Sequence, residues 1–261
     1  MNYNELSNTN LKLSSDSIFY NTIYNIEIFK NSFKTIKNKL IILCILSALV
    51  YEYTENDLIN NLCKQWELKN EIIKVENLVY GIFYTKEYIV ISFKGTSTIE
   101  DILTDITVIQ VDDKYSIPGK IHKGFHDMIL GNNICEKIYN SINKLLVDNS
   151  KNIYITGHSM GSSIATIMYA YLKVKIKNNL ELITYGCPKV GNKEFSKTSD
   201  KTNTIRIVNG NDIISKIPYS ILCLLNYTHP KNILNIGKKT TYFYSIEDHH
   251  ILNYYNSLNN L

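Results

Sequence analysis

The amino-acid sequence predicts an α/β fold with a central, mostly parallel sheet flanked by helices. Short runs of β-branched and aromatic residues alternate with longer segments of helical periodicity along most of the chain. The strand-like runs are almost continuously apolar, which is typical of parallel strands that are buried on both faces. The chain has 261 residues, of which 44% are hydrophobic, and this is enough for one large domain.

The predicted elements form one domain over residues 34–261, preceded by an N-terminal extension over residues 1–33 that is rich in Asn and Ser. In an open α/β sheet the active site lies at the carboxyl ends of the strands, so functional residues are expected just after each strand. The predicted strands span residues 81–84, 88–93, 152–156, 182–185 and 204–208. Further helical stretches span residues 131–147, 162–175 and 251–258.

The domain begins with two predicted helices, an apolar one over residues 40–50 and a second over residues 57–68. Lysines at positions 34, 37 and 39 precede the apolar run, so an uncleaved membrane anchor is an alternative interpretation. The run is too short to cross a bilayer, which favours a buried helix.

The strongest indication of function is the segment Gly157-His158-Ser159-Met160-Gly161. It follows a predicted strand and precedes a predicted helix, which is the context of a Gly-x-Ser-x-Gly nucleophile elbow. In such an elbow the serine Oγ projects from a sharp turn, and the glycines allow close backbone approach. The Met160 amide is then positioned to donate a hydrogen bond to a developing oxyanion. The segment therefore predicts Ser159 as a nucleophile.

A serine nucleophile needs a histidine base and a carboxylate that orients the histidine. In this fold class the order along the chain is Ser, then Asp or Glu, then His. Asp212 follows a predicted strand and belongs at the same sheet edge as Ser159, although a surface Asx turn is an alternative interpretation. His249 and His250 follow two acids near the chain end, and both are candidates for the base. A metal cluster of these histidines and acids is a weaker interpretation, because the spacing of a helical zinc motif is absent.

Three further features argue against other classes of function: the remaining histidines, the cysteines and the low arginine content. His122 and His126 are four residues apart, but Lys123 stands where a zinc protease motif needs glutamate, so we expect them and His229 to be structural. The five cysteines are scattered without a Cys-x-x-Cys pair, which favours reduced, buried thiols. Arg206 is the only arginine, which argues against a nucleic-acid partner.

Several segments, in the right order over roughly residues 43–255, resemble the class 3 lipases, the family of fungal triacylglycerol lipases and plant phospholipases of the A1 type. The similar segments are Phe93-Lys94-Gly95-Thr96-Ser97 with Asp101 and Asp105, residues 121–125, residues 157–161, residues 184–192, residues 208–214, and Asp248-His249 with Tyr254.

The resemblance implies an α/β-hydrolase fold in which Ser159 is the nucleophile, Asp212 the orienting acid and His249, rather than His250, the general base. Thr96 would contribute its backbone amide and its hydroxyl to an oxyanion hole, alongside the Met160 amide. An acyl enzyme would form and be hydrolysed without a metal or an organic cofactor.

Three positions depart from the family pattern. Ser162 replaces a second glycine after the elbow, Ile102 stands where many members have a lid tryptophan, and Lys189 stands where arginine is usual. The second and third departures concern the surroundings of the site, so the resemblance leaves the details of the substrate open.

The resemblance also implies a lid segment. Residues 97–107 place four apolar side chains on one face of an amphipathic helix, suited to packing over an ester site or to opening against a lipid surface. An ordinary surface helix is the alternative. Residues 213–225 form a second apolar stretch, which either lines an acyl pocket or faces a membrane.

The expected function is therefore a serine-dependent hydrolase of lipid carboxylic esters, similar to a triacylglycerol lipase or a phospholipase A1. Its substrate would be a lipid ester at a lipid–water interface, with transient contact to a membrane surface. The alternatives are an esterase for short soluble esters and a catalytically silent relative that binds lipid or protein. Residues 1–15 lack the pattern of a secretory signal, so together with the unpaired cysteines they favour an intracellular location.

Overall fold

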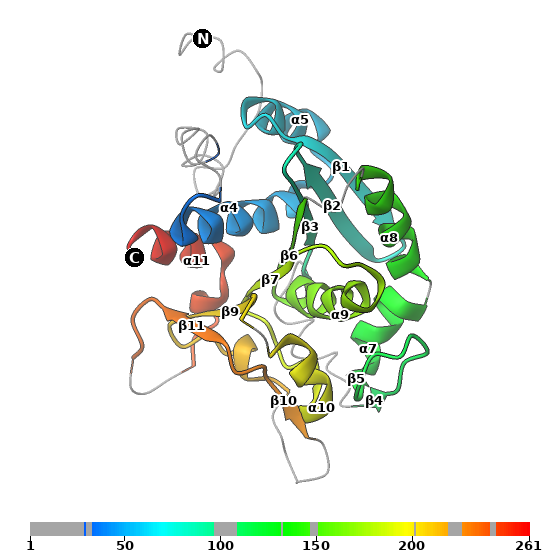
Figure 1. The fold of residues 1–261 in the computed structure, drawn as a ribbon. Helices are drawn as coiled ribbons and strands as arrows, with labels where there is room; N and C mark the ends of the chain where they lie inside the picture. Colours follow the sequence, from blue (N-terminus) through cyan, green and yellow to red (C-terminus); the bar gives the residue numbers. More distant parts are fainter. Residues whose placement is uncertain are drawn as a thin grey trace.

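A seven-stranded sheet forms the centre of the structure, a computed structural model that describes residues 29, 33–96, 109–131, 133–146, 151–200, 202–218, 226–240 and 244–261. The strand order is β1-β2-β3-β6-β7-β9-β11 (Figure 1). The strands β3 to β11 pair in parallel, and β1 and β2 are antiparallel at one edge. The bounds are β1 Lys69–Val75, β2 Leu78–Tyr84, β3 Tyr88–Phe93, β6 Asn152–His158, β7 Leu180–Tyr185, β9 Thr204–Asn209 and β11 Ile233–Ile236.

Helices cover both faces of this sheet, which gives three layers (Figure 1). On one face lie α4 (Ile36–Leu49) and α11 (Ile251–Asn259), which contact each other. On the other face lies α9 (Met160–Lys175), with α7 (Lys123–His126) and α8 (Ile134–Leu145) beside it. The predicted mostly parallel sheet flanked by helices is confirmed.

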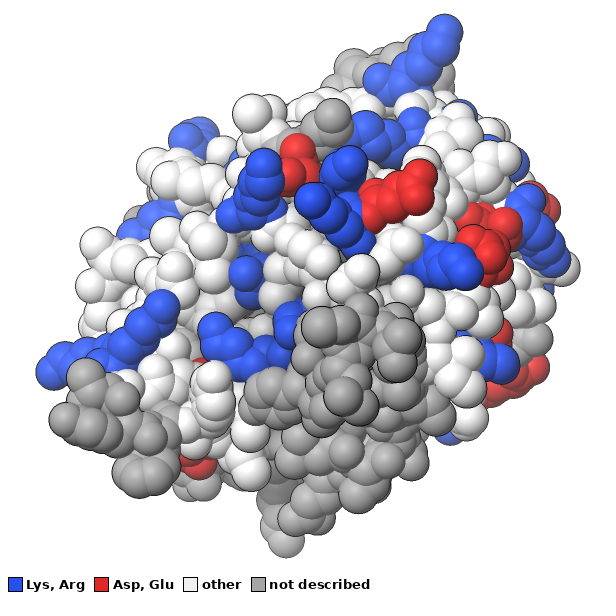
Figure 2. Space-filling view, turned by 90° about the horizontal axis from the view of Figure 1, so that it is seen from below, with Lys and Arg blue, Asp and Glu red and all other residues white. Residues whose placement is uncertain are grey.

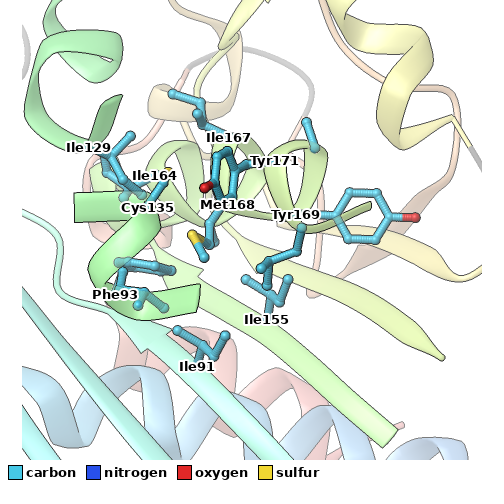
Figure 3. Close-up of a cluster of buried hydrophobic side chains, with 14 of the residues drawn as sticks. Ile91, Phe93, Ile129, Cys135, Ile155, Ile164, Ile167, Met168, Tyr169 and Tyr171 are labelled. Atoms are coloured by element: carbon cyan, nitrogen blue, oxygen red, sulfur yellow. The ribbon is translucent and has the colours of Figure 1, made fainter. Parts of the chain in front are cut away.

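The alternation of side chains along the strands produces two separate cores. In β3, Val90 packs into the core that contains α4 and α11, whereas Ile89 and Ile91 pack into the core that contains α9. Figure 3 shows part of the second core, where Ile91 and Ile155 from the sheet face Met168 of α9. Because both faces of the central strands are buried, these strands are apolar almost throughout.

The apolar segment over residues 40–50 forms a buried helix, as predicted. Every residue from Leu40 to Leu49 is buried in α4, and the Tyr185 hydroxyl of β7 donates a hydrogen bond of 2.5 Å to the Leu40 carbonyl. The Thr35 side chain caps the helix by accepting from the Asn38 amide. Among the described residues, no helix is long and apolar enough to cross a membrane.

Two parts of the architecture were not predicted. The first is β1, whose residues alternate between exposed and partly buried at the sheet edge, so its sequence lacks an apolar run. The second is a small antiparallel sheet in the order β10-β8-β5-β4. Its strands are β4 Gln110–Val111, β5 Ile121–His122, β8 Gly191–Asn192 and β10 Tyr227–Thr228. The helix predicted over residues 57–68 is α5, Asn56–Gln65.

Several predicted segments lie outside the described residues: most of the N-terminal extension over residues 1–33, the lid segment over residues 97–107, and residues 219–225 of the second apolar stretch. Two residues of the extension are described. Phe29 stacks on Trp66 with ring centroids 4.1 Å apart, and Phe33 stacks on Tyr154 at 4.3 Å. The four described cysteines, Cys44, Cys63, Cys135 and Cys187, are free and buried.

The register of the parallel strands places the segments that follow β3, β6, β7 and β9 side by side. Phe93, at the end of β3, pairs with Gly157 of β6, and His158 pairs with Tyr185 at the end of β7. Tyr185 in turn pairs with Ile207 of β9. The segments that follow β3, β6, β7 and β9 therefore leave the sheet at neighbouring positions along one edge.

Candidate active site

Ser159 occupies a strained turn between β6 and α9. Its φ is 59° and its ψ is −131°, a combination that non-glycine residues rarely adopt and that costs free energy. The turn is held by a hydrogen bond of 2.9 Å from the Ser159 amide to the Tyr185 carbonyl. A Cβ at Gly157 would lie 2.5 Å from the Gly161 backbone, and a Cβ at Gly161 would lie 2.2 Å from the Phe93 carbonyl oxygen. Both glycines are therefore required by the close approach of helix and strands.

The Ser162 hydroxyl fits the space where the family has a second glycine. Ser162 is fully buried, and its Oγ lies 2.6 Å from the Gly157 carbonyl oxygen and 2.8 Å from the Tyr185 carbonyl oxygen. It also accepts a hydrogen bond of 3.2 Å from the Tyr185 amide. The hydroxyl thus links the first turn of α9 to β6 and β7, and the departure leaves the elbow intact.

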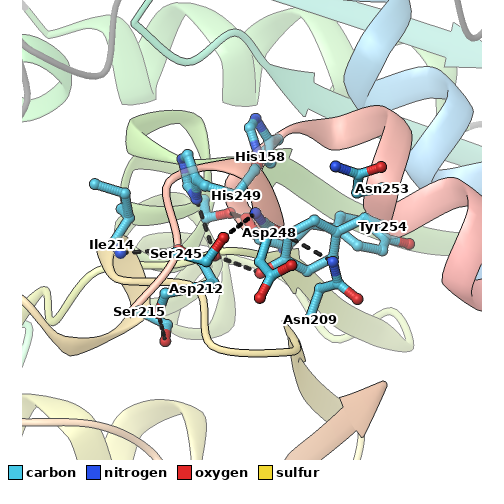
Figure 4. Close-up of polar contacts among 12 residues, drawn as sticks. His158, Asn209, Asp212, Ile214, Ser215, Ser245, Asp248, His249, Asn253 and Tyr254 are labelled. Carbon is cyan, nitrogen blue, oxygen red and sulfur yellow. Dashed lines mark hydrogen bonds and ion pairs between the residues drawn. The ribbon is translucent and has the colours of Figure 1, made fainter. Parts of the chain in front are cut away.

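Asp212 and His249 form a buried, hydrogen-bonded pair (Figure 4). His249 Nδ1 lies 2.9 Å from Asp212 Oδ2, and the two side chains are 2% and 0% exposed. The same Oδ2 accepts a bond of 2.5 Å from the Tyr254 hydroxyl, and Oδ1 accepts from the Ile214 amide at 2.8 Å. Burial acts to raise the pKa of Asp212, but the hydrogen bonds from His249, Tyr254 and Ile214 outweigh it and lower the pKa. Asp212 is therefore an ionised acceptor.

The two candidate bases lie in different environments. His249 is 1% exposed and contacts Asp212, whereas the side chain of His250 is 55% exposed and lies 3.6 Å from the exposed carboxylate of Glu247. A carboxylate can only accept, so Nδ1 of His249 carries the proton of the neutral ring. The unprotonated Nε2 is then available as a base.

The Ser159 Oγ and the His249 Nε2 are both buried, and neither has a hydrogen-bond partner among the described residues. The rings of His158 and His249 lie 4.6 Å apart, so the segment that contains Ser159 packs directly against His249. A Cβ at Gly186 would lie 2.8 Å from both Asp212 Oδ2 and His249 Nδ1, which shows how closely the end of β7 approaches the pair. Catalytic hydrogen bonds are often longer without substrate and tighten in the complex.

Thr96 and Met160 lie together beside Ser159. The Thr96 hydroxyl donates to the Met160 Sδ at 3.3 Å. A thioether is a weak acceptor, so the hydroxyl is easily redirected to a stronger one. A Cβ at Gly95, the preceding residue, would lie 3.2 Å from the Ser159 Cβ. The Met160 amide belongs to the first turn of α9, where the amides have no partner within the helix and the dipole favours negative charge.

The His158 ring links Tyr51, which follows α4, to the backbone of His249. Its Nε2 lies 2.7 Å from the His249 carbonyl oxygen, which can only accept, so Nε2 carries the proton. Its Nδ1 then accepts from the Tyr51 hydroxyl at 3.0 Å. Burial, followed by the charge of His249, lowers the pKa of His158 to about 3, so the ring is neutral at ordinary pH. A Cβ at Gly95 would lie 2.2 Å from the Tyr51 hydroxyl, so Tyr51 also supports the loop that carries Thr96.

The remaining histidines have local partners. His229 Nε2 lies 2.7 Å from the Ser215 carbonyl oxygen, and burial, followed by the charge of Arg206, lowers the pKa of His229 to about 3. His122 is buried and stacks on Phe125 with centroids 4.3 Å apart. Within the described part of the chain, no group of three His, Cys, Asp or Glu residues is arranged to hold a metal ion.

The family model for "Lipase (class 3)" matches residues 90–221, which is half of the chain and includes Ser159 and Asp212. The chain belongs to the class 3 lipase family.

Relatives of this class 3 lipase include curated proteins and solved structures. It is 30% identical over 154 residues to a chloroplastic phospholipase A(1) of Arabidopsis thaliana, covering 51% of this chain and 34% of the relative. It is 29% identical over 145 residues to a lipase of Rhizomucor miehei, covering 51% of this chain and 38% of that one. The chain therefore spans little more than a third of the length of these relatives. A mono- and diacylglycerol lipase from Aspergillus oryzae superposes with a TM-score of 0.66 at 20% identity, covering 83% of this chain and 86% of that chain, which shows a shared fold.

The five site residues predicted for this class 3 lipase lie in a network of side chains that was not predicted from the sequence. The structure brings Asp212 and His249 into contact, and Thr96 and Met160 into contact. Tyr51 was assigned no role, and no local pattern distinguishes it, because its partner lies 107 residues away in the sequence. Lys189, where arginine is usual, donates to the Pro218 carbonyl at 3.1 Å.

Proposed function

We propose that the chain is a serine-dependent hydrolase of lipid carboxylic esters, with Ser159 as nucleophile, His249 as general base and Asp212 as the acid that orients it. The observation that carries this proposal is the buried pair of His249 and Asp212, which fixes Nδ1 and leaves Nε2 without a partner among the described residues. Membership of the class 3 lipases supports the same chemistry.

In the proposed reaction, Ser159 Oγ attacks the ester carbonyl and its proton passes to His249 Nε2. The imidazolium is stabilised by ionised Asp212, whose three hydrogen-bond donors hold the carboxylate in place. Negative charge develops on the carbonyl oxygen, and the amides of Thr96 and Met160, with the Thr96 hydroxyl, donate to it. The tetrahedral intermediate then collapses, and His249 gives its proton to the departing alcohol. Water attacks the acyl enzyme by the same steps, with His249 again acting as base and then as acid.

The proposed substrates are lipid esters of glycerol, either neutral glycerides or phospholipids. The names of the relatives, phospholipase A(1) for one and mono- and diacylglycerol lipase for others, support both classes. An esterase for short soluble esters and a silent lipid-binding protein remain competing hypotheses. The candidates for nucleophile, acid, base and oxyanion donors are all present, which favours an active enzyme.

The proposal is tested by hydrolysis of a short nitrophenyl ester, a long-chain triglyceride emulsion and phosphatidylcholine vesicles. We expect fatty acid release by the wild type and none by Ser159→Ala. The neighbouring histidines give a matched pair, since His249→Asn should abolish turnover and His250→Asn should leave most of it. If the folded wild type turns over none of the three substrates, or if Ser159→Ala retains activity, the proposal is wrong.

A further inference from the structure

A small cavity lies between α9, β7, β9 and the segment after β10. It has a volume of about 20 Å³, and a space of this size holds a water molecule or an ion of similar size. Apolar and hydroxyl side chains form most of its wall, together with one permanently charged side chain, that of Arg206. No Asp or Glu of the described part of the chain lines the cavity.

Arg206 has no counter-charge among the described residues. Its Nε is buried without a hydrogen-bond partner there, and its guanidinium forms no ion pair with any of them. Burial lowers the pKa of Arg206, but a guanidinium keeps its proton in a protein, so the side chain stays charged. Buried charges are normally paired, because the loss of their hydration is costly. The cavity therefore adjoins a partly buried cation that lacks an anionic partner.

The groups that act most strongly on the charge of Arg206 are themselves uncharged. They are the Cys187 thiol and the Tyr254 hydroxyl. Burial raises the pKa of Cys187 to about 11 and raises that of Tyr254 well above its ordinary value, so both groups keep their protons at ordinary pH. Neither side chain therefore supplies the negative charge that Arg206 lacks.

Two lysines add to the positive charge around the cavity. Burial, followed by the charges of Lys216 and Arg206, lowers the pKa of Lys189. The same three cations act to lower the pKa of His229, whose side chain belongs to the cavity wall. Ionised Asp212 offsets part of this charge at Lys216. The cavity therefore lies in a positive potential, with Arg206 as the cation that reaches its wall.

The acids nearest to the cavity wall in the sequence do not neutralise Arg206. Asp200 Oδ1 accepts a hydrogen bond of 3.1 Å from the Lys231 amide, and Glu194 is exposed on α10 (Lys193–Ser196). Residues of α10 and β10 contribute to the wall, and both elements lie at the lower end of Figure 1. Figure 2 shows the molecule from that end, with Lys and Arg side chains at the centre and most acidic side chains towards one side.

We propose that this cavity binds a small monovalent anion of the size of chloride, with the Arg206 guanidinium as its main ligand. The anion accepts hydrogen bonds from the guanidinium and supplies the missing charge. A water molecule of similar size would accept the same bonds but would leave the charge unbalanced. The cavity is too small for a phosphate or a lipid headgroup. The inference does not rest on the proposed function, because it concerns no group of the proposed reaction.

The test compares the melting temperature of the full chain in sodium chloride and in sodium gluconate at equal ionic strength. Gluconate is too large for the cavity, so the comparison removes general screening by salt. An anion that binds only the folded chain raises the melting temperature, by about 3 °C when chloride is in roughly tenfold excess over its Kd. The rise should be absent in Arg206→Gln. In crystals of the wild type grown with bromide, anomalous scattering should place a bromide ion in the cavity beside Arg206.

Two further variants make the test independent of the folding of Arg206→Gln. Lys189→Gln keeps an N–H for the Pro218 carbonyl but removes one charge, so it should weaken chloride binding by roughly threefold. Lys137→Gln with Lys144→Gln removes two exposed charges of α8 and should respond to chloride as the wild type does. No rise with chloride, an equal rise in all variants, or a cavity without bromide overturns the inference. None of these results bears on ester hydrolysis, which is measured separately.

Discussion

The Tyr254 hydroxyl donates a hydrogen bond of 2.5 Å to Asp212 Oδ2, the same oxygen that accepts from His249. Tyr254 thus contributes to the lowered pKa of Asp212. Replacement by phenylalanine removes one donor and raises that pKa towards its ordinary value of 3.8. Loss of a buried hydrogen bond to a charged group should cost about 1.5–3 kcal/mol of unfolding free energy at neutral pH.

The unfolding free energy lost in Tyr254→Phe should become smaller as the pH falls. A carboxyl whose pKa is depressed by folding stabilises the fold above its ordinary pKa, and this contribution disappears as the pH falls through the depressed value. The difference between wild type and Tyr254→Phe should therefore shrink below pH 3.8. Urea unfolding over a pH series measures this difference in unfolding free energy. Tyr255→Phe is the control, because the buried Tyr255 side chain makes no hydrogen bond to a described residue. A loss of unfolding free energy that stays constant with pH would contradict a hydrogen bond from Tyr254 to ionised Asp212.

Asp212→Asn should reduce kcat by about 10⁴-fold while leaving the fold in place. The amide of asparagine can present an N–H to His249, which favours the tautomer with the proton on Nε2 and removes the base. Ester hydrolysis measured under saturating substrate gives kcat directly. A reduction of less than about tenfold would show that Asp212 does not orient the proposed base.

His158 and His229 should make the protein less stable at acidic pH. Both have pKa values of about 3 in the fold, against an ordinary value of 6.5. Between these values the unfolded chain binds protons that the folded chain does not, so the free energy of unfolding falls as the pH falls. The slope is at most about 1.4 kcal/mol per pH unit for each histidine. Urea unfolding between about pH 6 and 4.5 should show it, and His229→Asn should reduce the slope. An unchanged slope in that variant contradicts the prediction.

Gly95→Ala should impair the proposed catalysis by displacing the loop that carries Thr96. The added Cβ would lie 2.2 Å from the Tyr51 hydroxyl and 2.6 Å from the His158 carbonyl oxygen, so the loop that carries Thr96 must move. Displacement of one oxyanion donor typically costs on the order of a hundredfold in kcat. Gly131→Ala is the control, because its added Cβ meets nothing closer than 3.8 Å. Equal kcat values for the two variants would show that the Thr96 loop has no part in the reaction.

The sequence was informative where local patterns reflect burial. Apolar runs such as residues 88–93 predicted β3 at its observed bounds, because a strand with two buried faces is apolar almost throughout. The sequence also predicted that Asp212 follows a strand, and the structure places it just after β9. By contrast, β1 carries Lys69, Asn70 and Glu71 at an exposed edge and has no comparable signal. The role of Tyr51 depends on a long-range contact with His158, which no window of sequence contains.

Phe93 pairs with Gly157, and His158 pairs with Tyr185, so the segments that carry Thr96 and Ser159 leave the sheet side by side. Thr96, Ser159 and Asp212 stand within three residues of the ends of β3, β6 and β9, so their relative positions depend on the register of the sheet, whereas His249 is held by its hydrogen bond to Asp212. Insertions in the connections between strands leave this register unchanged. A one-residue slip in β3 or β6, in contrast, would separate the oxyanion donors from the nucleophile. A change of length within these strands should therefore disturb the proposed site far more than a change of length in the connections between them.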